Sequence, residues 1–124
     1  MEQALANLHR MMAIWNSADA AEQRALAEHA LEHNVHFADP NHNIVGREAF
    51  LAMVVQLQER IPGATYTHDS RIDVQNNFCR YYWKIDWNGT RVMNGFDMTE
   101  VNDGGKIVQV IGFFGLLDRE SAPA

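Results

Sequence analysis

The chain has 124 residues, of which 47% are hydrophobic and 21% are charged, a balance typical of one soluble globular domain. Its net charge is −6 and its ten Lys and Arg residues are scattered, which argues against nucleic acid or an anionic membrane as a partner. The single cysteine, Cys79, excludes an internal disulfide. We expect one domain over residues 1–120 and a short tail over 121–124.

The sequence predicts neither a signal peptide nor a membrane span. The residues after Met1 lack the charged-then-apolar pattern of a signal peptide. No apolar run approaches the ~20 residues that cross a bilayer. We therefore expect a cytoplasmic protein.

The first third of the chain is expected to be helical. Four residues recur at helical spacing and should form the apolar face of a first helix: Leu5, Leu8, Met12 and Trp15. Ser17 or Asp19 is a suitable N-cap for a second helix over residues 20 to about 32. Its core face should hold Leu26, Ala30 and Leu31.

The middle of the chain contains a short extended piece and a third helix. Residues 35–38 are expected to be extended, because Pro40 disfavours helix at Asp39. A loop over 41–46 should lead to a third helix, which starts near Arg47 and ends before the Pro-Gly pair at 62–63.

The remainder is expected to form a long antiparallel meander. Residues 65–74 and 79–87 alternate in the manner of strands, with a turn over 75–77 between them. Asn88-Gly89 is a strong hairpin signal, and strands over 91–101 and 107–115 should flank a turn at 103–105. Helices followed by a meander predict an α+β architecture.

Two carboxylates are candidates for chemistry. Asp97 lies within a predicted strand, on the same face as Met93, Gly95 and Thr99, where a carboxylate is costly to bury unless it is hydrogen-bonded or protonated. Asp39 ends the extended piece before Pro40. Each also has a structural interpretation: Asp97 as a hydrogen-bonded strand residue, and Asp39 as a turn residue that accepts backbone N–H bonds.

The histidines and aromatic residues leave alternatives open. His29 and His33 have the i, i+4 spacing that could share a metal with Asp39, but no HExxH pattern is present, and we expect surface histidines and no metal. His36 or His42 could tune Asp39 or relay its proton. The aromatic face of Tyr81, Trp83 and Trp87 is either packed core, a dimer interface or the wall of a pocket for a flat apolar ligand.

Two segments carry a resemblance to a known family. These are HFADPNHNIVGREAF over residues 36–50 and GFDMTEVNDGGKIVQVIGFFG over 95–115. Together with the order of helices and strands, they resemble the nuclear transport factor 2-like superfamily, and within it the SnoaL-like branch. The resemblance covers nearly the whole chain. It implies a cone-shaped, barrel-like curved antiparallel sheet wrapped by about three helices, in a protein that forms a homodimer through the outer face of the sheet.

The resemblance also implies roles for the two carboxylates. In ketosteroid isomerases of this superfamily, the residue matching Asp39 is the general base, and the residue matching Asp97 stays protonated and donates a hydrogen bond to the dienolate oxygen. In SnoaL-type polyketide cyclases, the Asp97 position supplies the acid–base residue. The first-helix Tyr donor of the isomerases is replaced here by Met11, and Tyr81 or Tyr82 could substitute for it.

These observations predict an enzyme or a binding module. The enzyme would be an isomerase or cyclase without a cofactor, acting on a small hydrophobic carbonyl compound by proton transfer through Asp39 and Asp97. The expected pocket residues are Trp15, Phe37, Tyr81, Trp83, Met93 and Phe113. The alternative is a module of the same fold that binds a small molecule or dimerises without catalysis.

Overall fold

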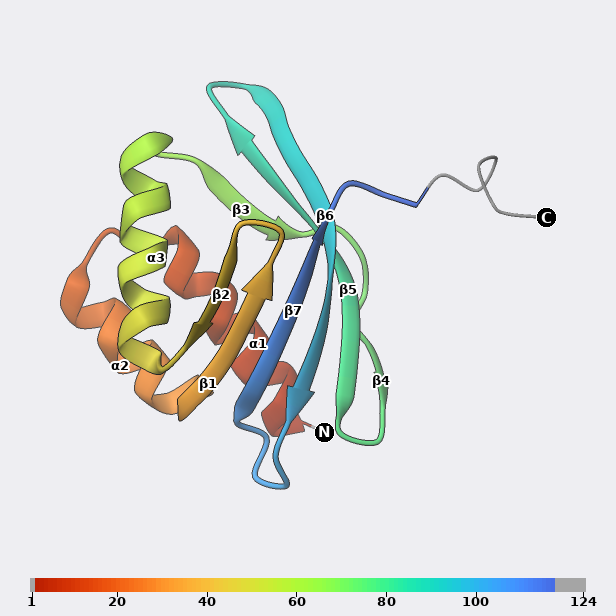
Figure 1. The fold of residues 1–124 in the computed structure, drawn as a ribbon. Helices are drawn as coiled ribbons and strands as arrows, with labels where there is room; N and C mark the ends of the chain where they lie inside the picture. Colours follow the sequence, from red (N-terminus) through yellow and green to blue (C-terminus); the bar gives the residue numbers. More distant parts are fainter. Residues whose placement is uncertain (1, 118–124) are drawn as a thin grey trace.

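One curved sheet carries helices on one of its faces, as Figure 1 shows for a computed structural model that describes residues 2–117. Over these residues the elements are α1 (Glu2–Asn16), α2 (Ala20–Ala30), β1 (Leu31–Asp39), β2 (His42–Val45), α3 (Arg47–Arg60), β3 (Thr65–His68), β4 (Asp73–Gln75), β5 (Phe78–Trp87), β6 (Thr90–Val101) and β7 (Ile107–Phe114). The predicted α+β class with a curved sheet and three helices is confirmed. The predicted tail at 121–124 lies outside the described residues.

The sheet has the strand order β2-β1-β7-β6-β5-β3, and β4 pairs with β5 beside this path. Most neighbours are antiparallel, as predicted, but β1 and β7 pair in parallel. This pairing joins the start of the chain to its last strand. It places Asp39, at the end of β1, beside the last residues of β7.

The first third of the chain departs from the sequence-based expectation. The buried face of α1 holds Ala4, Asn7, Leu8, Met11 and Ile14, whereas Leu5, Met12 and Trp15 are only partly buried. The second helix ends at Ala30, and the fully buried Leu31 already begins β1, opposite Ile107. Pairing with β7 therefore overrides the helical spacing that continued through Leu31 in the sequence.

Two predictions about strands are also corrected. The expected loop over 41–46 contains β2, which returns along β1 so that His42 lies opposite Asp39. The expected strand over 65–74 is broken into β3 and β4, which pair with different parts of β5. The hairpin at Asn88-Gly89 is confirmed: both residues have positive φ, 52° and 77°, as a two-residue turn of this type requires.

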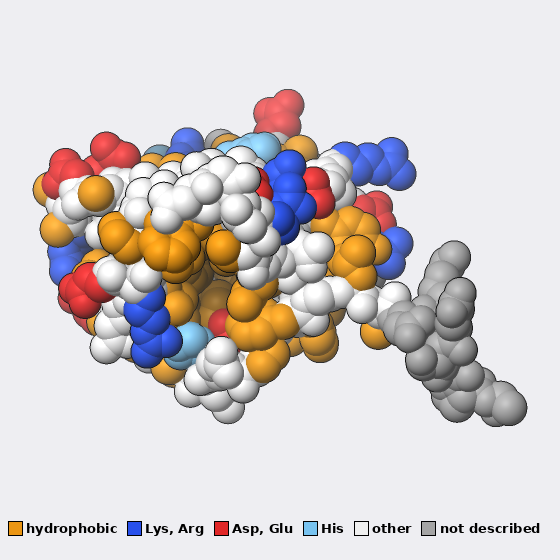
Figure 2. Space-filling view, turned by 90° about the horizontal axis from the view of Figure 1, so that it is seen from above, with side chains coloured by type: hydrophobic (Ala, Val, Ile, Leu, Met, Phe, Trp, Pro, Cys, Tyr) orange, Lys and Arg blue, Asp and Glu red, His pale blue; other side chains and the backbone are white. Residues whose placement is uncertain are grey.

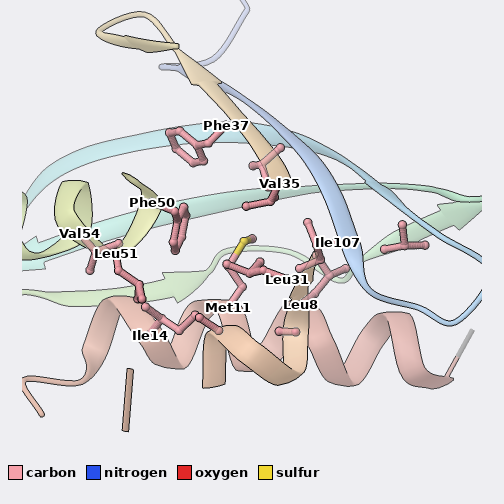
Figure 3. Close-up of a cluster of buried hydrophobic side chains, with 14 of the residues drawn as sticks. Leu8, Met11, Ile14, Leu31, Val35, Phe37, Phe50, Leu51, Val54 and Ile107 are labelled. Carbon is pink, nitrogen blue, oxygen red and sulfur yellow. The ribbon is translucent and has the colours of Figure 1, made fainter. Parts of the chain in front are cut away.

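The core lies between the helices and the inner face of the sheet. Figure 3 shows Leu8, Met11 and Ile14 of α1 below this core, with Phe37 and Val35 of β1 above it. Phe50 and Val54 of α3 close the cluster and are almost fully buried. The helices therefore cover one face of the sheet and leave its other face without a cover within residues 2–117.

Alternation along the strands separates the two faces of the sheet. On the inner face, β5 places Cys79 and Tyr81, and β6 places Thr99 and Val101, all of them buried. The outer face carries exposed apolar residues that include Phe78, Tyr82, Met98 and Phe113. None of the helices within residues 2–117 is long and apolar enough to cross a membrane.

Candidate functional site

Four residues form a row across the inner face of the sheet. Asp97 of β6 lies opposite Tyr81 of β5 on one side and opposite Gly112 of β7 on the other. Ala38 of β1 pairs with Ile111, so Asp39 continues the row beside Gly112. The register of four strands thus brings together the two carboxylates that lie 58 positions apart in the sequence.

Gly112 separates the two carboxylates. A Cβ atom at this position would lie 3.1 Å from Oδ1 of Asp97 and 3.5 Å from Cβ of Asp39. Any side chain here would crowd the Asp97 carboxyl group, because 3.1 Å is tighter than ordinary van der Waals contact. The missing side chain therefore lets both carboxylates lie close to this position.

Asp97 accepts a hydrogen bond at each of its oxygens. Tyr81 Oη donates to Oδ2 over 3.0 Å, and Trp83 Nε1 donates to Oδ1 over 2.9 Å. Tyr81 Oη also lies 3.4 Å from Oγ1 of the buried Thr99. A carboxyl group bound at both oxygens is fixed in position, which is what a proton-transfer residue requires.

The pKa of Asp97 is raised from 3.8 to about 7, chiefly because burial disfavours the charged form. The hydrogen bonds from Tyr81 and Trp83 oppose this shift, and the charge of Asp39 adds to it. Burial and the charge of Asp97 raise the pKa of Tyr81 well above 10, so its hydroxyl remains a donor. Asp97 therefore changes protonation near neutral pH, where a general acid or base is most effective.

Asp39 is held by its own loop. Its Oδ1 accepts the backbone N–H of Asn41 over 2.8 Å and lies 2.9 Å from Nδ1 of His42. The Asp39 side chain is only 9% exposed. Both contacts use the same oxygen, and Oδ2 has no hydrogen-bond partner within residues 2–117. The turn predicted for Asp39 is present, and it leaves one carboxylate oxygen free.

Two of the predicted pocket residues join an aromatic cluster on the inner face. The Trp15 ring lies 6.5 Å from that of Phe37, 5.9 Å from that of Phe50 and 5.2 Å from that of Tyr66. Met93 lies on the same face as Asp97 but near the β5–β6 turn, where it is 38% exposed. Tyr81 and Trp83 contact Asp97 directly. They are therefore hydrogen-bond donors to Asp97 and not only apolar side chains of the predicted pocket wall.

Phe113 does not join these residues. The register pairs it with Phe96 on the outer face, where the two rings lie 6.1 Å apart and Phe113 is 50% exposed. The inner face is instead reached by the next residue, Phe114, whose ring lies 6.1 Å from that of Trp83. The prediction was wrong by one residue, which in a strand reverses the face.

His36 also lies on the outer face. Its ring nitrogens contact Oδ1 of Asn43 and Nε2 of Gln109, so it does not touch Asp39, whereas His42 does. Met11 is buried in the core. Tyr82 is exposed on the outer face, which leaves Tyr81 as the phenol beside Asp97. No group of His, Cys, Asp and Glu within residues 2–117 has the arrangement of a metal site.

Three features of the site were not identified from the sequence. Gly112 could not be found by counting across the turn at 103–105, because the register shifts between Glu100 and Val101 and moves the partner of Asp97 by one residue. The unpaired polar atoms of Tyr66 and His68 on β3 carry no sequence signal, because they follow from packing alone. His68 is only partly buried, and this burial lowers the pKa of its imidazole to about 4.

The molecule is hollowed at one end. Figure 2 shows an opening walled largely by hydrophobic side chains, with an acidic side chain visible inside it and a histidine at its edge. On the inner face, His42 contacts Asp39, and the rings of Trp15 and Phe37 lie 6.5 Å apart. Two shallow depressions of about 280 and 430 Å³ lie elsewhere, and neither is lined by Asp39 or Asp97.

Solved structures with the same fold include candidate enzymes. A candidate isomerase of the SnoaL-like family from Agrobacterium tumefaciens is 28% identical, with 94% of this chain and 100% of that chain covered and a TM-score of 0.85. A candidate SnoaL-like polyketide cyclase from Jannaschia sp. CCS1 is 14% identical, with coverage of 91% and 85% and a TM-score of 0.74.

The same fold also occurs without a natural function. A de novo designed protein with a curved β-sheet is 18% identical, with coverage of 96% of this chain and 88% of that chain and a TM-score of 0.69. No family model and no curated protein matches the chain. The fold alone therefore does not assign an activity, and only the two carboxylates point to one.

The raised pKa of Asp97 predicts a specific dependence of stability on pH. The folded state keeps a proton that the unfolded state loses above pH 3.8, so the stabilisation from Asp97 is present below that pH and is lost as pH rises toward 7. We expect the unfolding free energy of Asp97→Asn, relative to wild type, to rise by roughly 3–4 kcal/mol between pH 4 and pH 8. Urea denaturation at several pH values measures this difference.

The control for this measurement is His68→Gln. The pKa of His68 is lowered, so its contribution is present above pH 6.5 and is lost as pH falls toward 4, which is the opposite sign. Relative to wild type, His68→Gln should therefore become less stable as pH rises. An Asp97→Asn difference that is the same at pH 4 and pH 8 would mean that Asp97 has an ordinary pKa.

Proposed function

We propose that this chain, which has the nuclear transport factor 2-like fold and resembles the SnoaL-like proteins, is an isomerase or cyclase that transfers a proton next to a carbonyl group. The observation that carries the proposal is the pair Asp39 and Asp97 on either side of Gly112. One carboxylate has a free oxygen, and the other takes up a proton near neutral pH. A base and an acid placed on one inner face meet the needs of enolisation.

In the proposed reaction, Asp39 is the base. Its Oδ2 removes a proton from the carbon next to the carbonyl, and the electrons of that C–H bond move toward the carbonyl oxygen. Oδ1 remains bound to the N–H of Asn41 and to His42, which holds the carboxylate in place. His42 is thus a positioning residue for Asp39.

Asp97 acts in this reaction as the neutral donor. In its protonated form it donates a hydrogen bond to the oxygen on which negative charge develops. Tyr81 and Trp83 hold its two oxygens, so the donor is in place before the reaction begins. Return of the proton from Asp39 to a different carbon gives an isomer. Attack of the enolate carbon on a second carbonyl gives a ring: the π bond of that carbonyl breaks, and its oxygen takes up the proton that Asp39 removed.

A binding module is the second candidate, and one observation favours it. The first-helix position that holds a Tyr donor in related isomerases holds Met11, which is 3% exposed and packed in the core. The donor is therefore absent at that place in the described chain. A pocket that only binds a carbonyl compound or phenol would still use Asp97, Tyr81 and Trp83 as polar contacts.

We also propose a homodimer formed through the outer face of the sheet. Phe113 and Tyr82 are 50% and 47% exposed there, and Phe96 lies between them with its ring 6.1 Å from one and 5.9 Å from the other. Met98 and Phe78, each 37% exposed, extend this apolar patch along β5 and β6. Contiguous apolar patches of this kind on one face favour association with a second copy.

Exchange of α-protons tests the catalytic proposal directly. Flat bicyclic ketones such as 2-tetralone are incubated in D₂O with the protein, and loss of the α-proton signal is followed by NMR. We expect Asp39→Asn to slow exchange by about 10²–10⁴, and Asp97→Asn by about tenfold or more, because the first removes the base and the second weakens the donor. The exposed Asp73→Asn is the matched control and should leave the rate unchanged.

Substituted phenols separate this proposal from the binding module. Suppose that phenols bind in a manner that depends on Asp97, but no ketone exchanges faster than in buffer. The binding module would then replace the enzyme. If exchange is fast but is unaffected by Asp39→Asn, the role of Asp39 as the base is wrong.

Sedimentation equilibrium tests the dimer. We expect wild type to sediment as a dimer and Phe113→Glu to sediment as a monomer, because a carboxylate placed on the apolar patch must be desolvated on association. Val55→Glu, at an exposed position of α3 on the helical side of the molecule, is the control and should remain dimeric. A wild type that stays monomeric at all concentrations would contradict this interface.

A further inference from the structure

Tyr66 carries a buried hydroxyl group with no partner. The residue is 6% exposed, and its Oη is buried without a hydrogen bond within residues 2–117. Burial raises the pKa of this phenol, so the group is a neutral donor. A buried polar group without a partner is costly, and Phe would fill the same space without that cost. The hydroxyl therefore needs an explanation beyond packing.

The backbone of Tyr66 is fixed at the edge of the sheet. The side-chain amide of Asn16 accepts the N–H of Tyr66 over 2.8 Å and donates to its carbonyl over 2.7 Å. The Tyr66 ring lies 5.2 Å from that of Trp15, inside the aromatic cluster with Phe37 and Phe50. Because both the backbone and the ring are held, the hydroxyl is kept inside the molecule rather than turned to water.

Tyr66 lies on the same face as Asp97, but further along the sheet. It pairs with Ile85 on β5, and Tyr81, the partner of Asp97, lies four residues earlier on that strand. Residues four apart on a strand point to the same face. Four residues correspond to roughly 13 Å along the strand, so Tyr66 and Asp97 mark two separate ends of one stretch of the inner face.

A second unpaired atom lies between these two ends. His68, two residues after Tyr66 and on the same face, has a buried Nε2 without a hydrogen bond within residues 2–117. Its ring lies 4.7 Å from that of Tyr81 and 5.3 Å from that of His9. Along the inner face, polar atoms thus follow one another from Asp97 to Tyr66, with aromatic rings among them.

We propose that Tyr66 forms a second polar subsite, whose hydroxyl donates a hydrogen bond to an oxygen at the end of the ligand farthest from Asp97. The ligand is then a flat apolar compound with oxygen at both ends, such as a polycyclic hydroxyketone, rather than a simple ketone. His68 lies where it contacts the middle of such a compound. This inference rests on the proposed function, because it takes the end at Asp97 as the reacting end.

Two biphenyls that differ by one hydroxyl group test this subsite. Both 4-phenylphenol and 4,4′-dihydroxybiphenyl offer a phenol to Asp97, and only the second offers an oxygen at the far end. We expect wild type to bind the diol about tenfold more tightly than 4-phenylphenol. The diol can bind either way round, and this alone would give only a roughly twofold preference. Tyr66→Phe should reduce the preference to about that twofold level and leave the affinity for 4-phenylphenol unchanged. Tyr82→Phe, on the exposed outer face, is the control and should keep the preference.

The outcomes separate the subsite from the proposed function. If both biphenyls bind through Asp97 but Tyr66→Phe keeps the preference for the diol, the subsite is wrong and the proposed function stands. If the preference depends on Tyr66 while Asp97→Asn changes nothing, the subsite stands and the role of Asp97 falls. If neither biphenyl binds to wild type, both fall.

A stability measurement without ligand shows whether the Tyr66→Phe variant is correctly folded. Because Tyr66→Phe removes an unpaired buried hydroxyl, its thermal midpoint should be equal to that of wild type or a few degrees higher. A lower midpoint would mean that the hydroxyl has a structural partner, which overturns the inference.

Discussion

The pairing of β6 with β5 and β7 is the constraint on which the rest of the site depends. It places Asp97 between Tyr81, which binds it, and Gly112, whose missing side chain lets the carboxyl group lie close to the strand. The parallel pairing of β1 with β7 then brings Asp39 to the other side of Gly112. A shift of one residue in any of these registers would turn a carboxylate to the outer face and would separate the pair.

The arrangement that forms the site also lowers the stability of the folded protein. A carboxyl group that is buried with a raised pKa costs free energy whenever it is ionised, and three unpaired polar atoms on β3 add to this cost. Nothing in the packing requires these groups, since apolar residues would fill the inner face more favourably. Local departures from the rules of folding tend to occur where a ligand or a reaction uses them.

Much of the fold could be predicted from the sequence, because it rests on local signals. Alternation, the Asn88-Gly89 turn and the Pro-Gly pair after α3 place most of the elements correctly. Features that depend on distant pairing could not be predicted: β1 starts at Leu31 because of Ile107, and Phe113 faces outward because of Phe96. Asp39 and Asp97 were identified as candidates, but their juxtaposition across Gly112 and the donors Tyr81 and Trp83 required the structure.

Titration of the Asp97 carboxyl carbon by NMR tests the central claim most directly. The account predicts a pKa near 7 in wild type, because burial outweighs the two donors. Tyr81→Phe and Trp83→Phe should each raise this pKa by removing a hydrogen bond to the charged form. Asp39→Asn should lower it by removing a neighbouring negative charge. A wild-type pKa near 3.8, or one that ignores all three substitutions, would contradict the account.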